Sequence, residues 1–576
     1  MLLNTLLAAA SRPSPRALFM TSDRLLHRTV RPYGVYALHG LAYDATRNAI
    51  LAIDSARGYL VEIDPATDDT RTLNPYHAEE FIGVTGIALA GDRLWFTRSD
   101  SIYSCAIGDF AQPGRLEPKL LASLPYGASG IALWQSVVYV CSQKSGYIYA
   151  LHNETGAELA RYNAPGVGLE NLFVRDGQLW VSDTIEQTVY CLDRETGEVE
   201  FQLLTPFPTP TGLCFFPQDG DDDILYIAYA REEPYIRDDP NAANPYQLTF
   251  RDTTFLHPLH VYHNPESRYT LSNGYLVEMS YVEELAALDP VVLEGIEWQI
   301  AVPMDSPRQK VRSIEPVGLP FELREIDGQM MAVFPFDRLD EYETHLFGWK
   351  ATLELRGIKY HFRPSDAETD AEIPEGYTDL YLVDNDNLTM DADIVQRAAH
   401  AAIGSETNLL RKVLNIRDYT YDRLEYGIKP QIDTPDVVLR RGMGSCGEYV
   451  GVFLALLRLN GIPCRTVGRY KCPDRAEQQR MPLQPDFNHV WIEFYVPGYG
   501  WIPMESNPDD IDDRGPYPMR FFMGLAWYHV EIVKGVKFER IMKDGKRIDK
   551  EVASLGDLSI NHVRFQILEE LPPATA

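Results

Sequence analysis

The sequence has few positive charges for its length, and this shortage excludes several classes of partner. It carries 53 lysines and arginines against 83 aspartates and glutamates, which gives a formal net charge of −30 at pH 7. Nucleic acids and anionic membrane surfaces are bound by clustered Lys and Arg side chains. We therefore expect neither a nucleic-acid partner nor a membrane partner for this protein.

Long apolar runs and closely paired cysteines are also lacking. No apolar stretch approaches the roughly 18 residues that a transmembrane helix needs, so none is predicted. The seven cysteines are scattered over 576 residues, which does not indicate a disulfide framework. Four of them lie inside apolar strand-like runs, as small buried residues do: Cys105, Cys141, Cys191 and Cys214. A reducing compartment is the simplest account, and we predict a cytoplasmic location.

The N-terminal segment lacks the charge pattern of a secretory signal. In "MLLNTLLAAASRPSPRALFM" the apolar run is short, no basic residue precedes it, and Arg12 and Arg16 follow it. A secretory signal carries its positive charge before the apolar run. We interpret residues 1–30 as a leader or as a misassigned start, with Met20 as the alternative first residue.

The first half of the chain contains an internal repeat. The motifs "HGLAYD", "TGIALA", "SGIALW", "ENLFVR" and "TGLCFF" start at residues 39, 85, 129, 170 and 211, so the steps are 46, 44, 41 and 41 residues. Further short apolar strands follow each motif. Strands that repeat every 40–45 residues or so are typical of propeller blades. We predict an all-β propeller over 31–270 that resembles the NHL and SMP-30-like propellers. About six blades are expected: five are visible, and a sixth would combine the segment before Tyr33 with the stretch after Arg231.

Three further units are predicted downstream, which makes the fold class multidomain. Strand-like segments without a repeat, from about Gly274 to Pro364, predict a β-sandwich over 271–365. Helical patterns from Asp391 onward, followed by strands, predict an α+β core over 366–535. The remaining strand-like segments predict a C-terminal β tail over 536–576.

One cysteine occupies an unusual position in the α+β region. In "GMGSCGEYVGVFLALLRL" the apolar residues recur at helical spacing, which predicts a largely buried helix. Ser445 is its predicted N-cap, so Cys446 falls in the first turn. The N–H groups and the helix dipole at that end favour a thiolate. Cys446 is therefore a candidate nucleophile.

The partners that such a thiolate needs follow in the sequence. A thiol catalyst is usually paired with a His that cycles a proton. His489 begins the strand-like alternation "HVWIEFYV", and Glu505 follows the turn "PGYG" on the next predicted strand. A Cys at a helix start, a His on a strand and a carboxylate on the adjacent strand predict a Cys–His–acid triad. The candidate catalytic residues are Cys446, His489 and Glu505.

The segment from Arg441 to Asn507 resembles the core of the transglutaminase-like superfamily, of the bacterial type. The pieces "GSCGEY", "RLNGIPCR", "HVW" and "GWIPME" occur in the order and at the spacing of that family. With the preceding sandwich and helices, the resemblance covers about Gly274 to Asn507. It implies a papain-like fold, with Cys446 as nucleophile, His489 as base and acid, and residue 505 as the group that orients His489. It also implies acyl transfer or hydrolysis on protein or peptide amides through a thioester.

Two positions depart from the family pattern. The family's Asp is Glu505 here, and the nearby Asn507 is an alternative orienting group. The alanine of the family's "GIPAR" is Cys464, which we interpret as a core residue. An upstream aromatic residue, Tyr419 or Tyr421, is a candidate for a second oxyanion donor.

Metal sites are the alternative to a thiol site. Cys446, Cys464, Cys472 and His489 could ligate zinc, but they lack the close pairs that structural zinc sites use. The acidic segments 507–515 and 218–225 could attract calcium, but neither has EF-hand spacing. We expect no cofactor, with calcium as the alternative. A metal-dependent propeller hydrolase is a further alternative. A metal in the propeller channel would have four candidate ligands: His39, Asp54, Glu170 and Asp183.

The competing class of function is a non-catalytic interaction protein. In that hypothesis the propeller binds a partner protein and the thiol domain is a degenerate scaffold, as the change to Glu505 would suggest. The intact Cys446 and His489 favour an enzyme instead. The sequence does not decide whether water or an amine would resolve the thioester.

Overall fold

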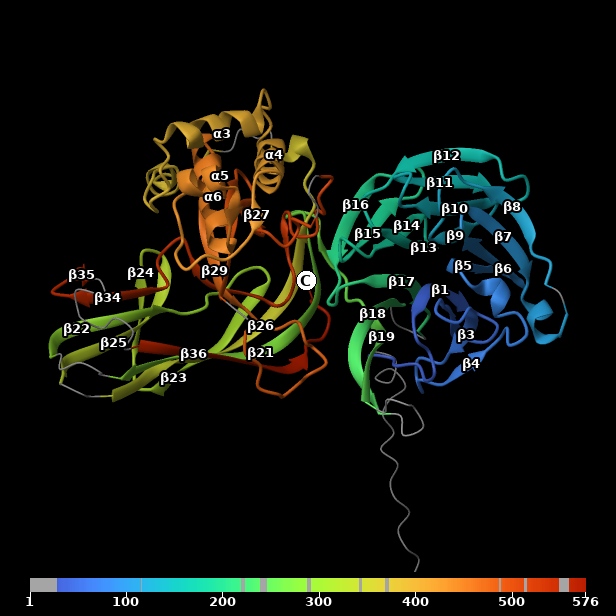
Figure 1. Ribbon diagram of the computed structural model, residues 1–576, viewed down its shortest axis with the longest axis horizontal. Coiled ribbons are helices and arrows are strands. Elements are labelled where there is room, and N and C mark those ends of the chain that lie inside the picture. The colour runs from blue at the N-terminus through green and yellow to red at the C-terminus, as the bar shows by residue number, and fades with distance from the viewer. Residues whose placement is uncertain are drawn as a thin grey trace, which may run out of the picture.

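The structure is a computed structural model that describes residues 28–575, except 115, 219–222, 239–245, 287–291, 341–343, 368–371, 486–487, 512–514 and 549–558. It is mainly β, with the helices gathered in one part of the C-terminal half (Figure 1). The predicted leader over 1–30 lies outside the described residues, apart from 28–30. In the part of the chain that is described, no helix is both long and apolar enough to cross a membrane.

Five small antiparallel sheets form the N-terminal half, with β1, β5, β9, β13 and β17 as their first strands. The first two sheets contain β1 (Leu38–Asp44), β2 (Ala49–Asp54), β3 (Tyr59–Ile63), β4 (Thr70–Thr72), and β5 (Val84–Ala90), β6 (Arg93–Arg98), β7 (Ser101–Ala106), β8 (Lys119–Ser123). The next two contain β9 (Ile131–Trp134), β10 (Val137–Ser142), β11 (Tyr147–His152), β12 (Glu158–Asn163), and β13 (Leu169–Arg175), β14 (Gln178–Asp183), β15 (Thr188–Asp193), β16 (Val199–Leu204). The fifth contains β17 (Pro210–Phe216), β18 (Ile224–Asp238), β19 (Tyr246–Pro258).

The first strands of the five sheets contact one another in a closed ring, with β17 next to β1. The repeated motif accounts for part of this closure, because its first residue bonds to the neighbouring sheet. Thr85 Oγ donates to Ser129 O at 3.0 Å, and Ser129 Oγ donates to Leu169 O at 3.0 Å. Thr211 Oγ donates to Leu38 O at 2.6 Å and so links the last sheet to the first.

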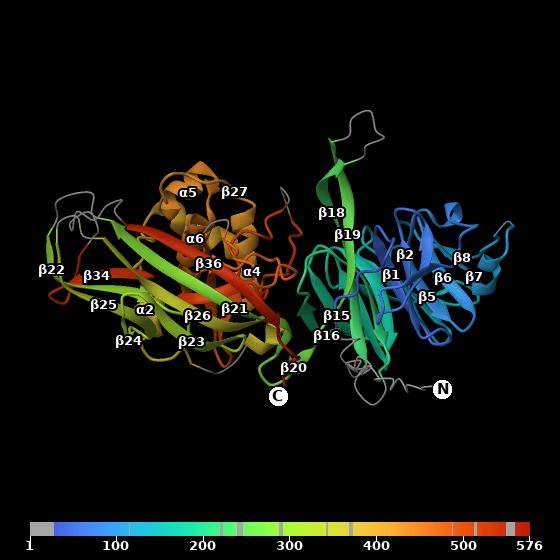
Figure 2. The same ribbon diagram turned by 90° about the horizontal axis from the view of Figure 1, so that it is seen from below.

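About six blades were expected, whereas the described residues form five sheets in this ring. The segment before Tyr33 does not start a sixth sheet, because Val30 forms a β-bridge with Leu256 of β19 in the fifth. The stretch after Arg231 instead lengthens β18 and β19 into a hairpin that projects from the ring (Figure 2). The ring is compatible with a propeller of five blades.

Two larger antiparallel sheets follow and share one hydrophobic core. One contains β20 (Tyr262–Asn264), β21 (Tyr269–Ala286), β23 (Gln309–Gly318), β26 (Thr344–Tyr360), β32 (Gly524–Leu525), β36 (Ser559–Glu570). The other contains β22 (Leu293–Ala301), β24 (Glu322–Ile326), β25 (Gln329–Leu339), β34 (Glu539–Lys543), β35 (Lys546–Ile548). Trp298 of β22 and Trp349 of β26 are fully buried in the shared core, as expected of a sandwich.

The strands of the predicted C-terminal tail complete this sandwich. β36 pairs with β21 along most of its length, and the two run side by side in Figure 2. β34 pairs with β22 in the opposite sheet. β36 therefore belongs to the same sheet as β20, which begins at Tyr262, before all the helices of the C-terminal half.

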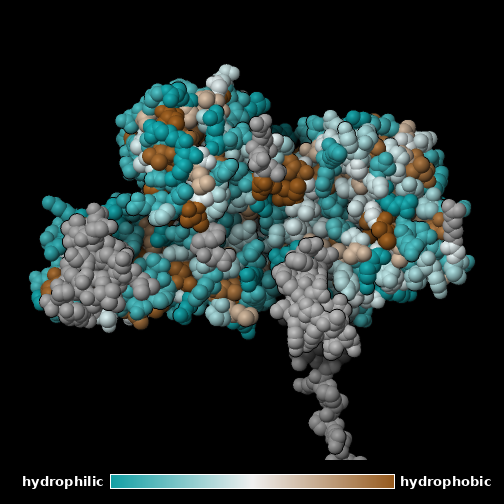
Figure 3. All heavy atoms as spheres, viewed as in Figure 1, coloured by the Kyte–Doolittle hydropathy of each residue, from teal (hydrophilic) through white to brown (hydrophobic). Residues whose placement is uncertain are grey.

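The helices pack on a four-stranded sheet of order β31-β30-β29-β33. The helices are α2 (Tyr377–Tyr381), α3 (Asp393–Ile403), α4 (Leu409–Tyr421), α5 (Pro435–Arg441), α6 (Cys446–Leu459). The strands of this region are β27 (Glu425–Tyr426), β28 (Met443–Gly444), β29 (Cys464–Lys471), β30 (Asn488–Val496), β31 (Gly500–Met504), β33 (His529–Lys534). The buried face of α6 and strands β29–β31 belong to one hydrophobic core, which fixes the helix start relative to the sheet. On the outside, the face shown in Figure 3 is mainly hydrophilic, with small separate hydrophobic patches.

Candidate functional site

Helix α6 begins at Cys446, as the sequence predicted. Ser445 and Glu448 form a capping box, in which the Glu448 carboxylate accepts from Ser445 N at 2.7 Å. Glu448 also accepts from Arg441 Nη2 at 2.7 Å and from Asp433 N at 3.0 Å. These bonds tie the helix start to the preceding loop, so the position of Cys446 is fixed from both sides.

Cys446 differs from the other six cysteines in its exposure. It is partly exposed, whereas the other six are buried. Burial raises the pKa of the Cys464 thiol to about 12, so that thiol stays protonated, and it donates to Leu454 O at 3.7 Å. The interpretation of Cys464 as a core residue is consistent with this burial. Exposure at a helix start is the setting in which a thiol can react.

His489 connects Cys446 to Glu505. Cys446 lies close enough to His489 to help raise its pKa, and His489 Nε2 lies 2.8 Å and 2.9 Å from the two carboxylate oxygens of Glu505. His489 and Glu505 are 3% and 1% exposed, so their contact is shielded from solvent. The structure thus brings together all three residues that the sequence singled out. Asn507, the alternative orienting group, accepts from Ser506 Oγ at 2.9 Å instead.

The electrostatics of this contact favour a charged pair. Burial acts to lower the pKa of His489, but the Glu505 carboxylate and the hydrogen bonds to Cys446 and Glu505 outweigh it, so the pKa is raised. Burial acts to raise the pKa of Glu505, but His489 and Lys471 hold it well below its ordinary value. Glu505 is therefore ionised at neutral pH and stabilises an imidazolium at His489.

Two further residues contact Glu505, and sequence patterns did not indicate either. Lys471 Nζ, at the end of β29, lies 2.6 Å from Glu505 Oε1. His529 Nε2, at the start of β33, lies 2.7 Å from the same oxygen, and His529 is fully buried. Lys471 and His529 are paired across β29 and β33, which places both beside the end of β31. Their only sequence signal is a position at a strand end.

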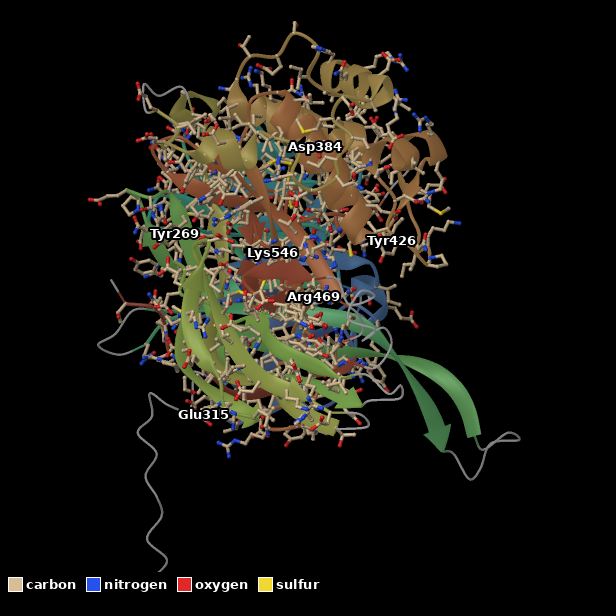
Figure 4. The ribbon with its side chains drawn as sticks, turned by 90° about the vertical axis from the view of Figure 1, so that its left-hand side faces the viewer. Tyr269, Glu315, Asp384, Tyr426, Arg469 and Lys546 are labelled. Atoms are coloured by element: carbon tan, nitrogen blue, oxygen red, sulfur yellow. The ribbon has the colours of Figure 1, made fainter. Side chains whose placement is uncertain are left out.

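The aromatic residue beside Cys446 is Tyr426 rather than either predicted tyrosine. Partial burial raises the pKa of Tyr426, and the neighbouring Cys446 raises it further. Tyr426 pairs with Gly444 through β27 and β28, and it lies near the surface of the helical part (Figure 4). Tyr421 is packed among buried rings, and Tyr419 lies under the Arg423 guanidinium.

The metal-ligand candidates do not gather into a group that could hold a metal ion. In the described parts of the chain, no group of three or more His, Cys, Asp or Glu side chains is placed to hold a metal ion. In the ring of sheets, His39 pairs with Glu170 at 3.1 Å, while Asp54 and Asp183 accept from backbone N–H groups of nearby loops. Asp509 and Asp510 of the first acidic segment bind Arg520 and Tyr449, and residues 219–222 of the second segment lie outside the described residues.

Comparison with known proteins places this site within a family. Residues 396–506 match the family model of the transglutaminase-like superfamily. The chain thus carries a transglutaminase-like domain, and the triad candidates Cys446, His489 and Glu505 all lie inside it. An uncharacterized protein of Haemophilus influenzae is 27% identical over 165 residues, which span 25% of this chain and 42% of that relative. The match therefore covers less than half of the relative's length.

Solved structures show weaker similarity to parts of the chain. A candidate cysteine protease from Cytophaga hutchinsonii is 17% identical, with a TM-score of 0.35, and covers 52% of this chain and 93% of that one. A glutaminyl cyclase from Myxococcus xanthus is 12% identical, with a TM-score of 0.28, and covers 40% of this chain and 95% of that one. At these TM-scores the similarities do not define a function for this chain.

Proposed function

We propose that this protein is a thiol enzyme that performs acyl transfer or hydrolysis on protein or peptide amides through a thioester on Cys446. The single observation that carries the proposal is the 2.8 Å contact of His489 with Glu505, next to Cys446 at the start of α6. Because His489 Nε2 is engaged with Glu505, we assign Nδ1 as the nitrogen that takes the thiol proton. The protein of Haemophilus influenzae matches only part of this chain and supplies no substrate.

The reaction proposed has two stages. The Cys446 thiolate attacks the amide carbonyl, and the C–N bond breaks as His489 gives its proton to the leaving amine. A thioester between Cys446 and the acyl group remains. His489 then takes a proton from water or from a second amine, which attacks the thioester, and returns it to the departing thiolate. Water gives hydrolysis and an amine gives transfer; we favour hydrolysis, since water needs no binding site of its own.

The position of Cys446 supplies part of the expected stabilisation. Its own backbone N–H lies at the start of α6, where the helix leaves N–H groups without intrahelical partners. A carbonyl oxygen that becomes negative during attack at Sγ would lie near these groups. Tyr426 is the side chain that we assign as a further donor to that oxygen.

The alternative is a non-catalytic interaction protein, which the change from Asp to Glu505 favoured. The 2.8 Å contact between Glu505 and His489 supports the enzyme, because the longer side chain still reaches the ring. Within the catalytic alternative, the ring of sheets is a candidate surface for a substrate or partner protein, by fold-level analogy alone.

The test is the rate of Cys446 alkylation by iodoacetamide against pH, with labelled sites read by mass spectrometry. Wild type is compared with Cys446→Ala and His489→Ala, and the buried Cys464 serves as the internal reference. Labelling of Cys446 that is fast below pH 7 and slowed by His489→Ala is expected. Labelling at the rate of an ordinary thiol with a pKa of about 8.5, indifferent to His489, would favour the interaction protein.

A further inference from the structure

We propose that His529 and Lys471 are positioning residues of the thiol site, which act on His489 through Glu505, and that the sandwich takes part by holding His529 through Arg308. The proposal rests on the proposed function, because it assigns these residues a role in chemistry at Cys446. It extends the three-residue site to a second strand and a second unit of the fold.

The Glu505 carboxylate is bonded on both oxygens. Oε1 lies 2.8 Å from His489 Nε2, 2.7 Å from His529 Nε2 and 2.6 Å from Lys471 Nζ. Oε2 accepts from Ser506 N at 2.7 Å, and His489 Nε2 lies 2.9 Å away. A carboxylate offers about four lone-pair positions, and these contacts account for them. Glu505 therefore cannot rotate away from His489 without breaking bonds to other residues.

The surroundings of His529 define its protonation state. Its Nδ1 lies 3.1 Å from Ala526 O, but that oxygen already accepts from His529 N at 3.2 Å and from Arg308 Nη2 at 2.8 Å. Both ring nitrogens thus face acceptor oxygens, and the shorter contact, to Glu505 Oε1 at 2.7 Å, assigns a proton to Nε2. Burial lowers the pKa of His529 to about 3, and the nearby Lys471 lowers it as well. His529 is thus a neutral donor to Glu505.

Three aromatic rings exclude water from His529. The centroids of Tyr528, Trp491 and Phe521 lie 4.8, 5.2 and 5.4 Å from that of the imidazole. A hydrogen bond to a carboxylate is stronger in such a setting than in water. The neutral His529 therefore fixes the direction of the Glu505 carboxylate without adding a charge to it.

Arg308 connects this arrangement to the sandwich. It lies between β22 and β23, it is 3% exposed, and its Nε donates to Arg356 O at 2.8 Å. Its Nη1 donates to His529 O at 2.7 Å, and its Nη2 donates to Ala526 O. The guanidinium also pairs with Glu531 at 3.2 Å, so its charge is compensated locally. The turn that presents His529 is thus held by a residue of another unit.

Lys471 differs from His529 because it carries a charge. The charged and titratable groups that face Glu505 are His489 from β30, His529 from β33 and Lys471 from β29, with Arg308 behind His529. A cation beside Glu505 offsets part of the attraction between Glu505 and the His489 imidazolium. Loss of Lys471 should strengthen that attraction, whereas loss of His529 should loosen the geometry.

The two roles predict different changes in the pH profile of Cys446 alkylation. His529→Leu should slow alkylation at pH 6 about tenfold, the lower end for one lost hydrogen bond to a charged group, and His529→Gln should restore most of the rate. Lys471→Met should move the upper transition of the profile, which reports His489, to higher pH by about one unit. Lys471→Arg, which keeps the charge, should leave the transition in place.

The matched control is His257→Leu. His257 is also buried and bonded to a carboxylate, Glu570, at 3.0 Å, but it lies outside the thiol site. The His257→Leu variant should have a lower melting temperature and an unchanged alkylation profile. The inference is overturned if folded His529→Leu and Lys471→Met both give the wild-type profile. If His529→Leu does not fold, His529→Gln beside Lys471→Met carries the test. Slow labelling of Cys446 in the wild type would instead contradict the proposed function.

Discussion

The ring of sheets and the C-terminal half both bury polar side chains, but they use them in different ways. In the ring, the buried Asp183 is bonded close by: it accepts from the N–H groups of Gly168, Ile185 and Glu186, all within its own sheet and loops. In the other half, side chains from three other strands converge on Glu505: His489 of β30, His529 of β33 and Lys471 of β29. The difference teaches that burial and hydrogen bonding alone do not identify a site, whereas convergence from distant elements does.

The largest expected effect comes from removing the charge at this point of convergence. Glu505→Gln should slow Cys446 alkylation at pH 6 by about 100-fold, because the imidazolium loses its counter-charge and its ring orientation. Asp183→Asn, at an equally buried carboxylate of the ring, should lower thermal stability and leave the rate of alkylation unchanged. For both variants, the rate of Cys446 alkylation and the melting temperature are measured. Equal effects of the two changes on the rate would remove the distinction between the halves.

An intermediate effect is expected at Tyr426. Tyr426→Phe should slow the hydrolysis of a p-nitrophenyl ester about tenfold, if its hydroxyl stabilises an oxyanion. Alkylation by iodoacetamide forms no oxyanion, so its rate should not change. Tyr421→Phe, at one of the two tyrosines that the sequence suggested, should alter neither rate. A loss of alkylation in Tyr426→Phe would show that the residue supports the fold of the site rather than the reaction.

The smallest effect is expected where the two halves meet. Glu186 of the ring accepts from Met519 N at 2.6 Å, and burial, then Asp183, raises its pKa to about 8. An acid whose pKa is raised by folding contributes stability below its unfolded pKa and loses it as pH rises toward the folded value. The free energy of unfolding, and with it the melting temperature, should therefore fall between pH 5 and pH 8.

Glu186→Gln is the check on this prediction, since it removes the titrating group and should flatten the dependence over that interval. Burial lowers the pKa of the nearby Lys359 to about 8, but its effect on stability falls above this interval. A slope that survives in Glu186→Gln would assign the pH dependence to other groups, such as Asp183, whose pKa burial raises to about 6.

Sequence patterns predicted those features that depend on neighbours along the chain. The five copies of the repeat correspond to the five sheets, and the apolar spacing predicted the start of α6 at Cys446. The family-like motifs indicated His489 and Glu505. Pairings between distant segments were not predictable, because no local periodicity encodes them. Val30 beside Leu256 changed the number of sheets, and β36 beside β21 placed the predicted tail in the sandwich. In the sequence His529 is a single histidine in a strand-like segment, and only the fold shows that it contacts Glu505.

The pairing of β36 with β21 has a consequence for the order in which the protein is made. Synthesis proceeds from the N-terminus, so the helix that carries Cys446 is complete before β33, β34 and β36 exist. Until those strands emerge, the sandwich lacks β34, β35 and β36, and Glu505 lacks the contact with His529. A nascent or C-terminally truncated chain would thus contain the thiol without the full set of groups around it, so the site matures only when the last strands are in place.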